Sequence, residues 1–348
     1  MRLILVFIGT LFVVSFFLTL TFVWDAYLSQ PEETANSVTL TIEEGDSVGV
    51  ITQRLEETAL VNSPLLFKGY VWLSKTQTSF QPGTFHVKPG MSYAALVKTL
   101  TVIETTDIVV TIPEGFTLSQ IGERLQSKGL VALDEWYAVV GDPAVDYRAD
   151  GSARRPKDFS GIFSFLSSKP EYVSLEGYLF PDTYRFFEGA TAEEIVVKML
   201  TNFGNKLTPE MRLAMEQQNK SVYDMVRLAS VVEREVRTDP DRAMVADLFS
   251  RRLQAAIPLQ ADSTVNYITG KNDPGVLNTD RQVDSLWNTY KYPGLPLSPI
   301  CNPGVEALQS AVYPQVNTYW YFLTDAEGTV YYAKTNDEHN ANRAKYLE

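Results

Sequence analysis

The chain has 348 residues, 45% of them hydrophobic and 21% charged, and its one cysteine, Cys301, excludes an internal disulfide. A formal net charge of −12 argues against binding nucleic acid or an anionic lipid surface through a basic patch. With His86 and His339 as the only histidines, a zinc hydrolase site is disfavoured, and we expect neither a metal nor a cofactor. The length predicts two or more domains.

The first feature along the chain is an uncharged, apolar run over residues 3–24. It is long enough to cross a hydrocarbon core of ~30 Å as a helix. Arg2 precedes it and Asp25 follows, which predicts a retained single-pass anchor in a bacterial inner (cytoplasmic) membrane, with the remainder on the periplasmic, extracytoplasmic side. A cleaved signal peptide is the alternative, but the run is longer than such peptides usually need. Residues 25–37 are polar and predict a stalk.

An internal repeat follows the stalk. Residues 41–45 (TIEEG) return 70 residues later as 111–115 (TIPEG), and each copy predicts a strand, a glycine turn and a helix starting near Ser47 or Thr117. A partial third copy begins at residue 85. Such units resemble LysM-type glycan-binding modules, so we interpret residues 38–105 as a LysM-like module. Sugar binding and plain scaffolding by this module both stay open.

Residues 106–348 predict a mixed α/β catalytic domain. Residues 141–170 have little periodicity and read as a loop, and helices are expected to start at Thr191 and Thr208 and to cover about 241–255. A β-like pair of segments ends the chain. The predicted fold class is therefore α+β: an N-terminal transmembrane helix, a LysM-like βα repeat module, and a mixed α/β catalytic domain.

One carboxylate stands where a hydrophobic side chain is expected. Residues 221–236 predict a helix with apolar residues three and four apart, and Glu233 projects into this stripe. A carboxyl held against apolar side chains favours its protonated form, which a general acid needs. The alternative is a Glu at the edge of the stripe that pairs with Arg227 or Arg237. Glu235 is the rival acid, but its position on the helix points toward solvent.

Several short motifs follow one another along the chain, on both sides of Glu233. They are 111–115 (TIPEG), 176–184 (EGYLFPDTY), 228–233 (LASVVE), 258–267 (PLQADSTVNY), 288–296 (NTYKYPGLP), 300–308 (ICNPGVEAL) and 336–340 (NDEHN). Together they resemble the MltG (YceG-like) family of endolytic murein transglycosylases over nearly the whole chain. The chain departs from the family pattern at Ala261, where Ser or Thr is common, and at 297–298, where Pro-Gly is common.

The resemblance implies that Glu233 is the catalytic acid/base of a membrane-anchored, cofactor-free lytic transglycosylase. Such an enzyme cleaves MurNAc–GlcNAc bonds within peptidoglycan glycan strands, gives 1,6-anhydroMurNAc ends, and can terminate the elongation of nascent strands. The expected partners are glycan strands, the inner membrane through residues 3–24, and peptidoglycan synthases. One carboxylate suffices because the 6-hydroxyl of the substrate is the nucleophile, whereas ordinary glycosidases use two.

Seven further residues are candidates for binding the glycan: Gln260, Asp262, Asn288, Tyr290, Asn302, Glu338 and His339. Each has a structural alternative. Asp262 can cap a helix, and Asn302 can serve a turn before Pro-Gly. Tyr290 can pack in the core, and the Glu338–His339 pair can be a polar surface segment.

Two other functions are open at this point. A water-using muramidase would pair Glu233 as acid with Asp262 as base, and its product would be a reducing end. A non-catalytic cell-wall-binding scaffold would dock glycan through the LysM-like units. A carboxylate inside an apolar stripe argues against the scaffold, because a binding module gains nothing from its desolvation cost.

Overall fold

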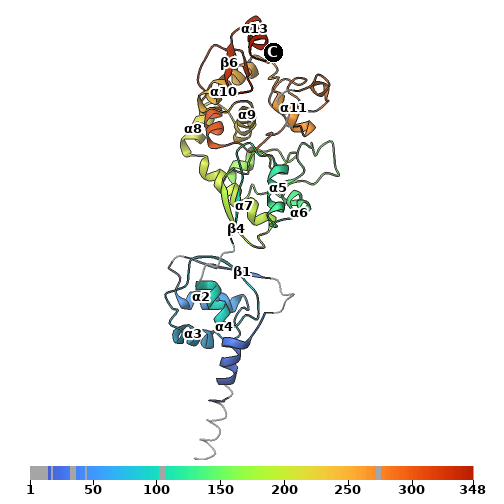
Figure 1. Cartoon of the computed structure of the whole chain (residues 1–348). Coiled ribbons are helices and arrows are strands. Elements are labelled where there is room, and N and C mark those ends of the chain that lie inside the picture. Colours follow the sequence, from blue (N-terminus) through green and yellow to red (C-terminus); the bar gives the residue numbers. More distant parts are fainter. Residues whose placement is uncertain are drawn as a thin grey trace, which may run out of the picture. The chain divides into compact units, whose positions relative to one another are not determined.

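The computed structural model describes residues 15–16, 19–31, 37–43, 45–101, 107–271 and 276–347 (Figure 1). The chain forms two compact units, unit 1 (residues 1–105) and unit 2 (residues 106–348). Each unit has its own cluster of buried hydrophobic side chains. Both units combine helices with two-stranded antiparallel sheets, so the chain is mixed α/β.

The predicted membrane anchor needs correction. Residues 1–14 and 17–18 of that segment lie outside the described residues, and the described remainder is helical at 15–16 and 19–23 and continues as the π-helix η1 (Trp24–Leu28). In the part of the chain that the structure describes, no helix is long and apolar enough to cross a membrane. The transmembrane helix and the single-pass membrane location are therefore wrong on this finding. The sequence shows an apolar run, but the described helix continues past that run to Leu28, and its Ala26 is buried in the core of unit 1.

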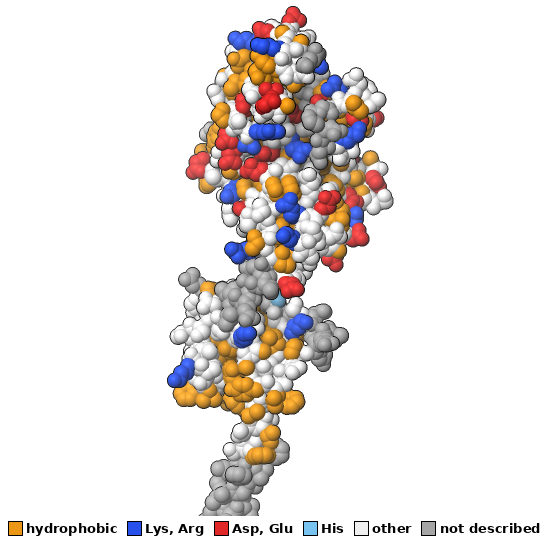
Figure 2. All heavy atoms as spheres, in the orientation of Figure 1, with side chains coloured by type: hydrophobic (Ala, Val, Ile, Leu, Met, Phe, Trp, Pro, Cys, Tyr) orange, Lys and Arg blue, Asp and Glu red, His pale blue; other side chains and the backbone are white. Residues whose placement is uncertain are grey.

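Unit 1 is a small α/β unit whose two paired strands are separated in sequence by two helices. Its elements are β1 (Val38–Ile42), α2 (Val48–Glu57), α3 (Pro64–Leu73), β2 (Gly83–Val87) and α4 (Tyr93–Thr101). Strand β1 runs antiparallel to β2. Ser47 and Ser63 cap α2 and α3, each accepting a backbone N–H three residues on. Figure 2 shows hydrophobic side chains gathered on the surface of this unit, where Leu65, Trp72 and Leu73 of α3 are exposed.

The predicted LysM-like repeat module is also corrected. The strands and helices of the repeated segments form close to where the sequence places them, but the two full copies do not assemble together. The strand of the first copy, β1, pairs with β2 inside unit 1, whereas the strand of the second copy, β3 (Asp107–Thr111), pairs with β4 (Thr183–Phe187) in unit 2. Strand pairing depends on distant partners, so local similarity between two copies does not fix their assembly.

Unit 2 begins with the β3–β4 ladder and the helices around it. The helices between β3 and α9 are α5 (Leu118–Ser127), α6 (Leu133–Val140), the 3₁₀ turn η2 (Ser164–Ser168), α7 (Ala192–Lys206) and α8 (Pro209–Gln217). The predicted helix starts at Thr191 and Thr208 are confirmed, since both residues are N-caps whose hydroxyls accept a backbone N–H.

The rest of unit 2 is arranged around one central helix, α9 (Val222–Glu235), which packs against α10, α11 and α12. The later elements are α10 (Asp239–Gln254), α11 (Asp262–Thr269), η3 (Asp280–Gln282), α12 (Val305–Val312), β5 (Tyr321–Thr324), β6 (Val330–Ala333) and α13 (Asn336–Tyr346). Helix α9 buries the predicted stripe but also Tyr223, Leu228, Ser230 and Val231. It is therefore enclosed on more than one face, which a single amphipathic stripe does not predict.

Candidate active site

Glu233 lies in the last turn of α9, and its side chain is only 6% exposed. Oε1 accepts a hydrogen bond from Nη2 of Arg242 at 2.9 Å, and Oε2 accepts the backbone N–H of Gly304 at 3.1 Å. This differs from the prediction that apolar side chains surround the carboxyl of Glu233. Glu233 is bound by a guanidinium and a backbone amide, and the predicted alternative partners, Arg227 and Arg237, do not supply that guanidinium.

Arg242 reaches Glu233 from the first turns of α10, and its side chain is 10% exposed. Its Nη1 also binds Oδ1 of Asp239 at 2.8 Å, and its Nη2 lies 3.8 Å from Oε2 of Glu114. Burial disfavours the charged guanidinium, but the neighbouring carboxylates outweigh this and raise the pKa of Arg242. The cation is therefore held among three acidic side chains.

Glu114 follows β3 and is the second carboxylate at this point of the fold. Its carboxyl occupies space that Gly304 leaves open, because a Cβ added to Gly304 would lie 2.0 Å from Oε1 of Glu114. Burial, followed by the negative charge of Glu233, raises the pKa of Glu114. The backbone turns at Gly115 in the left-handed region, with φ +75°, which favours glycine.

Asn302 holds the loop that supplies the Gly304 amide. It is fully buried, and its Nδ2 donates to the carbonyl of Phe116 and to Oε1 of Glu176, both at 2.9 Å. Its Oδ1 accepts two backbone N–H groups, from Gly177 and Leu179. All polar atoms of this side chain therefore bind within the protein, and Asn302 acts on the site through the backbone it fixes.

Glu176 is a fully buried carboxyl beneath the same loop. It accepts hydrogen bonds from the backbone N–H of Leu118 (3.0 Å) and the hydroxyl of Tyr267 (3.2 Å), besides that from Asn302. Desolvation raises the pKa of Glu176 to about 8, against the lowering effect of these donors. The carboxyl joins α5, α11 and the Asn302 loop.

Four of the predicted glycan-binding residues form one cluster beside α11. The hydroxyl of Tyr290 donates to Asp262 at 2.5 Å, and the backbone N–H of Tyr290 donates to Oδ1 of Asn288 at 3.0 Å. The backbone N–H of Gln260 donates to the carbonyl of Thr289. Asn288 is fully buried, whereas Gln260 is exposed and Asp262 and Tyr290 are partly exposed. As substrate contacts these residues stay predictions.

Glu338 and His339 lie elsewhere, at the start of α13. Glu338 accepts the backbone N–H of Lys334 at 2.7 Å and completes a capping box with Thr335. The ring of His339 stacks on Tyr321 of β5 with 5.4 Å between centroids. Burial lowers the pKa of His339. The contacts of this pair thus belong to α13 and the β5–β6 hairpin.

Glu235, expected in solvent, is in fact partly buried and hydrogen-bonded. It accepts hydrogen bonds from the hydroxyl (2.6 Å) and the backbone N–H (3.3 Å) of Ser263, and burial raises its pKa. The reason is that α11 packs over this face of α9, which the helix sequence alone does not show. Glu235 therefore holds the start of α11.

A comparison with models of known protein families gives a match that covers this site. The model of the YceG-like family matches residues 40–345, which include Glu114, Glu233 and the Gly304 loop. The chain belongs to the YceG-like family. The family resemblance inferred from the sequence motifs is thereby confirmed.

Named relatives of this YceG-like chain point in the same direction. It is 31% identical to the endolytic murein transglycosylase of Bacillus subtilis (strain 168), over 94% of this chain and 90% of the relative. It is 30% identical to the endolytic murein transglycosylase of Streptococcus pneumoniae (serotype 2, strain D39), over 94% of this chain and 61% of that longer protein. A crystal structure of the yceG-like protein lmo1499 from Listeria monocytogenes matches with 30% identity and a TM-score of 0.55, over 88% of this chain and 99% of that one.

Sequence reasoning named Glu233 but missed the groups that hold it. Glu114, Glu176 and Gly304 all stand in quoted motifs, yet a motif does not show which of its members face the same point in space. Arg242 lies outside the family motifs, nine residues past Glu233 and on the following helix. Two helices separated by a short turn can place such residues side by side.

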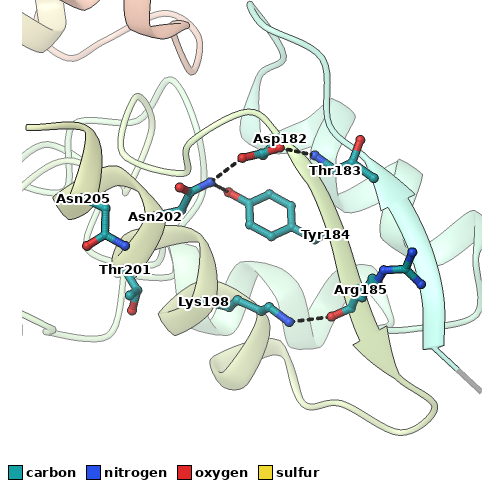
Figure 3. Close-up of a pocket in the computed structure, with 8 residues that line it drawn as sticks. All are labelled: Asp182, Thr183, Tyr184, Arg185, Lys198, Thr201, Asn202 and Asn205. Carbon is teal, nitrogen blue, oxygen red and sulfur yellow. Dashed lines mark hydrogen bonds between the residues drawn. The ribbon is translucent and has the colours of Figure 1, made fainter. Parts of the chain in front are cut away.

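Hollows open on the surface of unit 2. One, of about 340 Å³, lies beside the end of α9 and is lined by residues of α5 and α11 together with Arg234 and Ile300. Another, of about 470 Å³, lies between β4 and α7 (Figure 3). There Asn202 binds Asp182 and the hydroxyl of Tyr184. Neither hollow is lined by any of the predicted site residues.

Proposed function

We propose that this YceG-like chain is a lytic transglycosylase that cuts within the glycan strands of murein, with Glu233 as general acid and base. The observation that carries the proposal is the setting of Glu233, an enclosed carboxyl whose two oxygens are held by Arg242 and by the amide of Gly304. Its relatives named endolytic murein transglycosylases supply the substrate class.

The reaction needs one carboxyl group. Protonated Glu233 gives its proton to the glycosidic oxygen between MurNAc and GlcNAc, and the bond from that oxygen to C1 of MurNAc breaks. The 6-hydroxyl of the same MurNAc then attacks C1, and the Glu233 carboxylate takes its proton. The products are a 1,6-anhydroMurNAc end and a GlcNAc with a free 4-hydroxyl. Because the nucleophile is already part of the substrate, its entropic cost is small.

Arg242 and the Gly304 amide act on the carboxylate that forms after the first proton transfer. Charge-assisted hydrogen bonds of this kind are roughly twice as strong as neutral ones, so they stabilise the carboxylate. The backbone amide of Gly304 also holds the rotamer of Glu233, so the carboxyl oxygens stay aimed at one place. In this proposal the exposed members of the Asp262–Tyr290 cluster bind the strand, and an internal cut ends the elongation of a nascent strand.

The test is the chemistry of the new ends. Purified glycan strands digested in water enriched in oxygen-18 should give unlabelled MurNAc ends that are lighter by one water than reducing ends. Labelled, reducing ends as the main product would instead indicate a muramidase that activates water.

An Asp262→Asn variant separates these two enzymes independently. In a muramidase it would cost as much rate as Glu233→Gln, because each carboxylate would be indispensable. Here Asp262 is held by Tyr290 and Arg281, with Nη2 of Arg281 at 3.5 Å, so we expect a milder defect. No cleavage by the intact protein, together with binding of strands, would support the scaffold alternative.

A further inference from the structure

Two carboxylates of the candidate site share one nitrogen of one arginine. Nη2 of Arg242 lies 2.9 Å from Oε1 of Glu233 and 3.8 Å from Oε2 of Glu114. The two distances differ by less than 1 Å, so a small rotation of the guanidinium changes its partner. Nη1 stays anchored on Asp239 at 2.8 Å, which provides a fixed point for that rotation.

The fold places Glu114 at this nitrogen rather than leaving it on a free loop. The backbone N–H of Gly115 donates to the carbonyl of Asn302 at 2.9 Å, which ties the turn to the loop that binds Glu233. The space for the Glu114 carboxyl exists because Gly304 has no Cβ. Glu114 is 44% exposed, whereas Glu233 is 6% exposed, so Glu114 forms the solvent side of the pair.

The charges around Glu114 influence which of the two carboxyls, Glu114 or Glu233, binds Arg242. Glu114 is influenced by three anionic groups, Glu233, Glu306 and Asp239, and by one cation, Arg242. The negative charges favour the protonated form of Glu114, and the guanidinium of Arg242 favours its carboxylate. The raised pKa of Glu114, caused by burial and then by Glu233, agrees with the first of these effects.

We propose that Glu114 is a positioning residue of the catalytic centre, which receives Arg242 when Glu233 is protonated and releases it when Glu233 is a carboxylate. The inference rests on the proposed function and adds a second carboxyl to it. Before bond cleavage the guanidinium pairs with Glu114, so Glu233 keeps its proton for the glycosidic oxygen. After the transfer the guanidinium returns to Glu233 and stabilises the new charge. Glu114 itself exchanges no proton with the sugar.

The first test needs no enzymatic activity. Carbon-13 NMR of protein labelled at the glutamate carboxyls gives the titration of Glu114, whose signal is assigned by its absence in Glu114→Gln. In Glu233→Gln the midpoint of Glu114 should fall by about one pH unit or more, because the like charge is lost and Arg242 is free to pair with Glu114.

The matched control is Glu306→Gln, which removes a negative charge near Glu114 but not the shared guanidinium. Its effect on the Glu114 midpoint should be clearly smaller. A shift in Glu233→Gln no larger than that in Glu306→Gln would overturn the proposed exchange of Arg242, whether or not the protein cleaves murein.

The second test is the pH dependence of the cleavage rate. Glu114→Gln removes the competing anion, so Arg242 stays on Glu233 and the alkaline limb of the rate profile should move to lower pH by about one unit. Glu114→Asp keeps the charge on a shorter side chain and should restore part of the limb. A profile that superimposes on that of the parent, or that falls equally at every pH, would overturn the proposal. Absence of cleavage by the parent would remove the proposed function, while the titration still decides the exchange.

Discussion

The two copies of the strand–glycine–helix motif share their local structure but not their surroundings. In unit 1 the guanidinium of Arg54 donates to the carbonyl of Thr41 at 2.7 Å, and in unit 2 that of Arg124 donates to the carbonyl of Thr111 at 2.9 Å. Each copy turns at a glycine with positive φ and then caps its helix with a Ser or Thr hydroxyl. The same local sequence thus gives the same local fold twice.

The difference lies in what packs against the glycine. A Cβ added to Gly45 would meet no atom within 4 Å, whereas one added to Gly115 would lie 3.7 Å from side-chain carbons of both Glu233 and Arg234. Helix α9, which carries these two residues, has no counterpart at the first copy within the described part of unit 1. A candidate site therefore arises from the neighbour that the fold supplies, not from the repeated motif.

The largest effect on the cleavage rate should come from removing the carboxylate of Glu233, which lies next to the second copy and has no counterpart at the first among the described residues. Glu233→Gln keeps the shape but cannot cycle a proton, so the rate of strand cleavage should fall at least ~100-fold. Thermal unfolding checks that the variant still folds. Glu216→Gln, at an exposed position of α8 in the same unit, is the control and should leave the rate within about twofold. A variant that keeps more than about a tenth of the parent rate would take Glu233 out of the acid role.

The next effect should come from filling the space that Gly304 leaves. Gly304→Ala puts a Cβ 2.0 Å from Oε1 of Glu114, so either this carboxyl or the loop that binds Glu233 must move. Since a displacement of about 1 Å at a catalytic group can cost ~100-fold, we expect a loss of cleavage of ten- to a hundredfold. Gly161→Ala, which meets nothing within 4 Å, is the control. Equal rates in the two variants would show that the Glu114 carboxyl moves aside without disturbing the loop that binds Glu233.

A third prediction concerns Glu176, the buried carboxyl that accepts the backbone N–H of Leu118 in the helix of the second copy. The folded protein raises the pKa of Glu176 from 4.5 to about 8, so the fold binds its proton more tightly than the unfolded chain does. The stabilisation from neutral Glu176 is complete below about pH 4.5 and is lost as the pH rises through about 8.

Urea unfolding of the parent and of Glu176→Gln over this range measures that loss directly. A Gln amide can donate to the hydroxyl of Tyr267, and its oxygen can still accept from Leu118, so the variant should fold and show a flatter pH dependence. Parallel curves for the two proteins would show that Glu176 does not titrate differently on folding.

The sequence predicted local structure well where the information is local. The N-caps at Ser47, Thr117 and Thr191 and the strand before each glycine follow from hydroxyl and turn chemistry within a few residues. It failed where distant segments decide. The pairing of β3 with β4 placed the two full copies of the repeat in different units, and the placement of α11 partly buried Glu235.

The candidate site divides in the same way. Glu233 could be found because a carboxylate interrupts an apolar pattern, which is a property of one helix. Arg242, Glu114 and the Gly304 amide come from three separate segments, and no spacing rule relates them to Glu233. Asn302 was predicted to bind the glycan, but it is fully buried and its hydrogen bonds lie within the protein, a distinction that only the packing reveals.

The smallest effect, and the sharpest form of the comparison, is a matched pair of alanine substitutions at the two glycines. Gly45 and Gly115 have φ values of +90° and +75°, so alanine should destabilise either turn by roughly 1 kcal/mol. The added methyl group at Gly115 has room, since 3.7 Å is an ordinary contact distance, so Glu233 should be displaced only slightly. We therefore expect similar losses of stability in urea unfolding, a severalfold loss of cleavage for Gly115→Ala, and an unchanged rate for Gly45→Ala. An equal loss of cleavage in both variants would show that the first copy also serves the reaction, because the strain on the two turns is matched and only the neighbour differs.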